Sequence, residues 1–182
     1  MILFRKLNFL AAAAAAALLA APAAAQLAQN SDAPVDLTAD ELEVLNAQCL
    51  SIWRGSAEAL QDQSRLRADV LKTFFQVTGS TGSTASANCG DLLRIEAEGN
   101  VFYVTPDQRV RGRNAVYDAV SETITVTGDV VAAQGQNVLR GERLVISVKT
   151  GQAQMHTDVK GRGKPGRVRG VFYPDQQQSQ SR

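Results

Sequence analysis

The sequence predicts an all-β protein made of antiparallel strands stacked one after another. Segments rich in valine and threonine alternate apolar with polar residues, as in Glu122–Gly128, and this two-residue period is typical of a half-buried strand. Related segments recur with a period of about 29 residues. After residue 25 little of the chain has the apolar spacing of an amphipathic helix. Together these patterns favour strands throughout.

The N-terminal segment 1–25 has the features of a secretory signal peptide. Arg5 and Lys6 precede an alanine-rich apolar run, and Ala23–Ala25 forms a small-residue cleavage site. We therefore expect cleavage after Ala25 and a location outside the cytoplasm. The alternative is a retained membrane anchor, but the apolar run is shorter than the ~20 residues that a spanning helix needs.

A linker is expected over residues 26–36, followed by one domain over residues 37–174. Thr38–Val44 resembles a helix start, but its place in the repeat predicts a strand instead. A small residue marks each repeat, and successive markers are 29 residues apart within two groups: Ala39 and Ala68, then Gly112, Gly141 and Gly170.

The interval between the two groups of markers is 44 residues, which is longer than the repeat. The excess coincides with the stretch 78–88, which is rich in glycine, serine and threonine and predicts a flexible insertion loop. The last residues, 175–182, are polar and are expected to form a disordered tail.

Alternation places an apolar set of side chains on one face of the strands and polar residues such as Glu96 and Asp129 on the other. The alternation must slip by one residue near Arg113 and Glu142, so we expect a β-bulge at each. If the sheet stays open, the apolar face suits acyl chains, at roughly 0.8 kcal/mol for each buried CH₂. If it closes, the same face is an ordinary core. The candidate lining residues are Trp53, Ala57, Leu66, Leu71, Phe75, Ile95, Val101, Tyr103, Val110, Tyr117, Ile124, Val126, Val130, Leu139, Leu144, Ile146 and Val148.

The residues offer little for catalysis, and we expect no catalytic group, metal or cofactor. The one histidine, His156, lies in a polar stretch that suits a surface loop, and no serine or cysteine has an activating motif around it. Glu96 and Glu98 share the face expected to meet solvent. A polysaccharide-modifying enzyme of the cell envelope, built on stacked strands, is the alternative from a different functional class.

Charged residues and cysteines add three expectations. The formal charge becomes −1 once Arg5 and Lys6 are removed with the segment 1–25, which argues against a nucleic-acid partner. Cys49 and Cys89 are disulfide candidates in an oxidising compartment, and two buried thiols are the alternative. Arg109, Arg111 and Arg113 are candidates to meet phosphates at the rim of a lipid site, or else belong to a solvated strand face.

The order and spacing of several segments resemble the OstA-like family of LptA-type lipopolysaccharide-transport proteins. The similar segments are 37–40, 65–69, 95–101, 115–118, 124–130 and 166–174. The resemblance implies an open, twisted β-jelly roll in the periplasm that holds the lipid A acyl chains of lipopolysaccharide. The insertion and the cysteine pair depart from the family pattern without interrupting the repeat.

The same resemblance implies partners. An LptC-like protein at the inner membrane would deliver lipopolysaccharide and an LptD-like protein at the outer membrane would receive it. Contacts would run edge to edge through terminal strands near Ala39–Val44 and Val168–Phe172, which also permits head-to-tail self-association. An LptC-like protein or a detached LptD N-terminal domain are alternatives within the pathway, and a structural β protein with a closed core is another.

Overall fold

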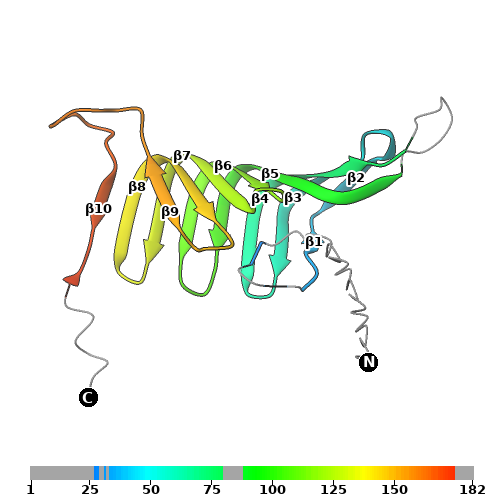
Figure 1. Ribbon diagram of the computed structural model, residues 1–182, viewed down its shortest axis with the longest axis horizontal. Helices are drawn as coiled ribbons and strands as arrows, with labels where there is room; N and C mark the ends of the chain where they lie inside the picture. The colour runs from blue at the N-terminus through cyan, green and yellow to red at the C-terminus, as the bar shows by residue number, and fades with distance from the viewer. Residues whose placement is uncertain (1–26, 29–30, 32, 80–87, 175–182) are drawn as a thin grey trace, which may run out of the picture.

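The computed structural model describes residues 27, 28, 31, 33–79 and 88–174, and these form one antiparallel sheet of ten strands. Figure 1 shows the strands following one another along the long axis, from β2 near one end to β10 at the other. The strands are β1 (Asp36–Thr38), β2 (Glu41–Leu45), β3 (Leu50–Gln61), β4 (Ser64–Val77), β5 (Cys89–Val104), β6 (Arg109–Asp118), β7 (Thr123–Gln134), β8 (Asn137–Ser147), β9 (Ala153–His156) and β10 (Arg169–Val171). One 3-10 turn, Asn46–Gln48, precedes β3.

The order in the sheet is β1-β3-β4-β5-β6-β7-β8-β10, and β2 and β9 pair with β3 and β8. From β3 to β8, strands that are adjacent in the sheet are also consecutive in the sequence, and each such pair forms a hairpin. The all-β prediction is thus confirmed. In the segment Thr38–Val44, Thr38 ends β1 and residues 41–44 belong to β2, so strands form there, as the repeat predicts, and no helix begins.

A row of β-bulges crosses the middle of the sheet. The bulged pairs Gly55-Ser56, Gly99-Asn100 and Gly128-Asp129 all have positive φ, and each lies opposite one residue of the next strand. The bulges face Arg113 and Glu142, where the sequence predicts them, but the extra residue belongs to the partner strand, β5 opposite Arg113 and β7 opposite Glu142. A residue pair in the left-handed region, which glycine enters without strain, keeps the strand continuous while bending it.

The bulge row divides the long strands into two halves and the sheet into two facing layers. The β1–β10 layer contains β1, β10 and the half of β3 that begins at Ala57. It also contains the halves of β4 to β8 that continue the pairing from this part of β3. The β2–β9 layer contains β2, β9 and the other halves. This is an open jelly roll, with β1 and β2 at one end and β9 and β10 at the other.

The core lies between the two layers. Ile95, Ala97, Val101 and Tyr103 are all at most 3% exposed, so the predicted inward direction of this strand is confirmed. Glycine is required beside them at Gly112, because a Cβ there would lie 2.5 Å from Val126 and 3.0 Å from the carbonyl oxygen of Thr127.

Several predicted segments lie outside the described residues. The segment 1–25, the tail 175–182 and residues 80–87 of the insertion are among them. Within the expected linker 26–36, Leu27 and Ala28 are buried in the structure, and β1 begins at Asp36. In the part of the chain that is described, no helix has the length and hydrophobicity to cross a membrane.

Candidate apolar cleft between the layers

Apolar side chains form continuous rows across the inner faces of both layers. In the β2–β9 layer, register aligns Leu71 with Ala97, then Ala115, Val126 and Leu144. These five residues are at most 2% exposed. The row continues outward to Leu42 of β2, which is 51% exposed. The apolar interior therefore reaches the β1–β2 end of the sheet.

A cleft of about 700 Å³ opens between the layers near the β9–β10 end. Leu139 lines it from the β1–β10 layer, and Leu144 and Ile146 line it from the β2–β9 layer. Ala132 and Phe172 are among the other apolar residues that line it, while hairpin residues such as those at 105–108 supply polar groups. This volume falls within the range of about 300–1,000 Å³ that is common for ligand sites.

The described N-terminal residues occupy the interior beside this cleft. Leu27 is 1% exposed, and its carbonyl oxygen accepts a hydrogen bond of 3.0 Å from the hydroxyl of Tyr103. Burial raises the pKa of Tyr103 to about 12. The side chain of Gln61 accepts a bond from the backbone N–H of Ala28 and donates one to the carbonyl oxygen of Ala33. These bonds satisfy polar groups that would otherwise be costly to bury.

The predicted lining residues divide into three groups. Five line the cleft: Tyr103, Leu139, Leu144, Ile146 and Val148. Ten others pack in the filled interior: Ala57, Leu66, Leu71, Ile95, Val101, Val110, Tyr117, Ile124, Val126 and Val130. Trp53 is half-buried against the core, and Phe75 is half-buried beside the cysteines at the other end. Most of the predicted lining residues therefore point inward, but they pack against other side chains and do not border the cleft.

The structure does not bring the three predicted phosphate-rim arginines into the cleft. Arg109 and Arg111 flank the buried Val110, so strand alternation directs them to the outer face. Arg113 lies at the bulge row and forms an exposed ion pair of 3.4 Å with Asp129. His156 is exposed at the end of β9, on a strand and not in a loop. No group of three or more potential metal ligands occurs among the described residues.

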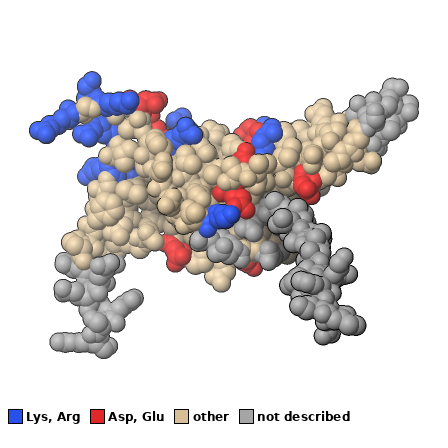
Figure 2. Space-filling model, in the orientation of Figure 1, with Lys and Arg blue, Asp and Glu red and all other residues tan. Residues whose placement is uncertain are grey.

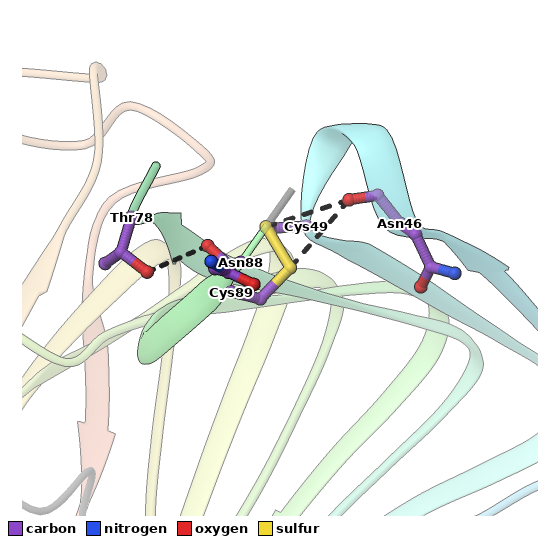
Figure 3. Close-up of a disulfide and its surroundings, with 5 residues drawn as sticks. All are labelled: Asn46, Cys49, Thr78, Asn88 and Cys89. Atoms are coloured by element: carbon purple, nitrogen blue, oxygen red, sulfur yellow. Dashed lines mark hydrogen bonds between the residues drawn. A yellow bond between two sulfur atoms is a disulfide. The ribbon is translucent and has the colours of Figure 1, made fainter. Parts of the chain in front are cut away.

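Cys49 and Cys89 form a disulfide, with their Cα atoms 5.4 Å apart (Figure 3). Both sulfur atoms lie close to the carbonyl oxygen of Asn46, at 3.9 and 3.8 Å. Beside the bridge, Thr78 donates backbone and hydroxyl hydrogen bonds to the carbonyl oxygen of Asn88. The disulfide therefore ties the start of β3 to the start of β5, where the insertion ends.

Three residues of the cleft, one in β7 and two near the ends of the chain, are missing from the predicted lining. Ala28, Ala132 and Phe172 line it, yet none is among the predicted lining residues. Ala132 follows the inward alternation of β7, which is a signal that the sequence carries. For Ala28 no periodic signal exists, because the segment before β1 is too short to show one.

Comparison with known proteins identifies relatives of this chain. Residues 36–168 match the family model described as LptA/(LptD N-terminal domain) LPS transport protein. An uncharacterised protein of Rhizobium meliloti (strain 1021) is 31% identical over 127 residues, which is 69% of this chain and 67% of the relative.

A solved structure shares the fold. It is LptH, described as the LptA-homologous periplasmic component of the lipopolysaccharide transport device of Pseudomonas aeruginosa. The TM-score is 0.63 at 15% sequence identity, and the match covers 80% of this chain and 99% of that one.

Proposed function

Because the chain belongs to the LptA/LptD N-terminal family of lipopolysaccharide transport proteins, we propose that it is a non-enzymatic periplasmic carrier of lipopolysaccharide. It would bind the lipid A acyl chains in the cleft between the layers. The observation that carries this proposal is the cleft itself, because Leu139, Leu144 and Ile146 present apolar surface from two facing layers of the sheet. A lipid crossing water needs such a surface, at roughly 0.8 kcal/mol for each buried CH₂.

The acyl chains would enter at the β9–β10 end and extend along the apolar rows. The middle of the interior is filled by side chains, so deeper entry would require the two layers to separate. The continuous strands β3 to β8 join the layers at the bulge row, and among the described residues no strand pair links the opposite rims of the two layers. Movement of one layer relative to the other would therefore leave the strand pairing intact.

The terminal strands suit the edge-to-edge contacts of a bridge. At one end β1 and β2 leave one edge each unpaired among the described strands, and at the other end β9 and β10 do the same. Exposed edges are templates for pairing with another chain. We infer an LptC-like donor at one end, an LptD-like acceptor at the other, and head-to-tail pairing of copies between them.

Binding to immobilised lipopolysaccharide tests the carrier directly. We expect the purified chain to be retained, free lipid A to compete, and deacylated lipopolysaccharide to compete poorly, because the acyl chains supply the apolar surface. Retention of no lipid would favour a structural protein with a closed core. Turnover of envelope glycans that is lost in Glu96→Gln or Glu98→Gln would favour the enzyme.

A further inference from the structure

The outer face of the β1–β10 layer carries arginine and apolar side chains in alternating rows. The strands β4 to β8 and β10 each present two outward side chains there, and each pair flanks one inward residue, as Arg109 and Arg111 flank Val110. Six of the twelve are arginines, all exposed: Arg65, Arg67, Arg109, Arg111, Arg140 and Arg169. We refer to this surface as the arginine face.

The other six side chains of the arginine face are apolar. They are Phe102, Val104, Val131, Ala133, Val138 and Val171. Register places Phe102 between Arg67 and Arg111, and neighbouring strands are about 4.8 Å apart, so Arg67 and Arg111 lie roughly 10 Å apart across the strands. Phe102 is 45% exposed and Val171 is 40% exposed. Single charged and single apolar side chains are therefore close neighbours on this face.

Carboxylates neutralise little of this charge. Glu58 of β3 lies 3.3 Å from both Arg65 and Arg67, whereas the other four arginines form no ion pair with the residues that the structure describes. The outer face of the β2–β9 layer differs, because three of its cations are paired with carboxylates. There the ion pairs are Arg54 with Glu43 at 2.8 Å, Lys72 with Glu98 at 2.6 Å and Arg94 with Glu96 at 2.7 Å.

Two further features accompany the arginine face, a basic loop at its β10 end and a shallow cleft within it. The loop between β9 and β10 contains Lys160, Arg162, Lys164 and Arg167, all exposed, and the cationic cluster projects at the β10 end in Figure 2. A shallow cleft of about 450 Å³ lies between Arg65, Arg67 and Phe102, with Asp62 at its edge. The positive surface therefore continues past the last strand.

We propose that the arginine face docks on the anionic surface of a phospholipid bilayer. Guanidinium groups bind phosphate oxygens in bidentate fashion, and lipid headgroups offer phosphates over a plane as wide as the sheet. The exposed apolar side chains between the arginines match the boundary between headgroups and acyl chains. An acidic protein partner would account for the arginines but not for the exposed apolar side chains between them. This proposal does not rest on acyl-chain binding, because the cleft lies between the layers and the arginine face points away from it.

Sedimentation with vesicles tests the docking. The full mature chain is expected to bind vesicles of phosphatidylglycerol and phosphatidylethanolamine, to ignore phosphatidylcholine vesicles, and to dissociate as sodium chloride rises from about 0.1 to 0.5 M. Arg109→Glu with Arg111→Glu should weaken binding at least about tenfold. The matched control, Arg143→Glu with Lys149→Glu, makes the same change in net charge away from the arginine face and should bind within about twofold of the original chain.

Three results would overturn the proposal: no binding to anionic vesicles, equal binding to phosphatidylcholine, or equal loss in both double variants. Thermal unfolding checks that each variant folds, and Arg109→Gln with Arg111→Gln replaces the charge reversal if it does not. The cleft variant Ala132→Trp should bind vesicles normally. Vesicle binding by this variant therefore distinguishes a failure of lipid A binding in the cleft from a failure of membrane docking.

Discussion

Ala132→Trp is expected to lower the affinity for lipid A on the order of 100-fold while leaving the chain folded. Ala132 lines the cleft between Val110 and Leu139 in register, and it is only half-buried, so an indole has open space to enter. Excluding about four methylene groups of an acyl chain costs roughly 3 kcal/mol. This free energy corresponds to a loss of affinity on the order of 100-fold. Titration of a fluorescent lipid A measures the dissociation constant.

The matched control for this variant is Val145→Trp. Val145 neighbours Leu144 but follows the opposite alternation, so its side chain lies on the outer face of the β2–β9 layer. The added indole should leave lipid A affinity within about twofold, because it occupies no part of the cleft. Unchanged affinity in Ala132→Trp, with normal thermal unfolding, would mean that acyl chains bind elsewhere.

Removing the disulfide by Cys49→Ala with Cys89→Ala is expected to lower the free energy of unfolding by about 3–4 kcal/mol. The bridge closes a loop with a sequence separation of 40 residues, and the entropy of that loop in the unfolded chain gives this magnitude. For a domain with a typical stability of about 5–15 kcal/mol, the loss is large. Urea unfolding followed by circular dichroism measures it.

Reduction of the original chain serves as the control for the alanine variant. Reduced chain and variant should unfold at similar urea concentrations, because both lack the same cross-link. The bridge lies at the β2 end, whereas the cleft lies near β9 and β10, so lipid A affinity should change little. A loss of stability below about 1 kcal/mol would show that the unfolded chain is not restrained by the bridge.

Periodicity made the strands and the inward direction of most core residues predictable. Side chains such as Ile95 and Val126 alternate with polar neighbours, and antiparallel hairpins convert that alternation directly into two faces. The bulges were predicted at Arg113 and Glu142 from the slip in phase. Which of two paired strands holds the extra residue is decided by backbone conformation. Here it is the strand whose glycine and following residue both have positive φ.

The open part of the interior could not be predicted from the alternation. Val101 and Leu144 have the same inward direction, yet Val101 packs in the filled core and Leu144 borders the cleft. The difference depends on what faces each residue from the other layer, which is a tertiary property. Arg109 and Arg111 were predicted at a lipid rim, but the pairing register across six strands places them with four other arginines on the outer face.

Photo-crosslinking from the cleft in living cells tests the central claim, that acyl chains lie between the two layers. A photoreactive amino acid at Leu139 faces the cleft, and one at Val145 faces outward from the β2–β9 layer. We predict that lipopolysaccharide is captured from position 139 and not from position 145. Capture from position 145 alone, or equally from both positions, would contradict binding between the layers.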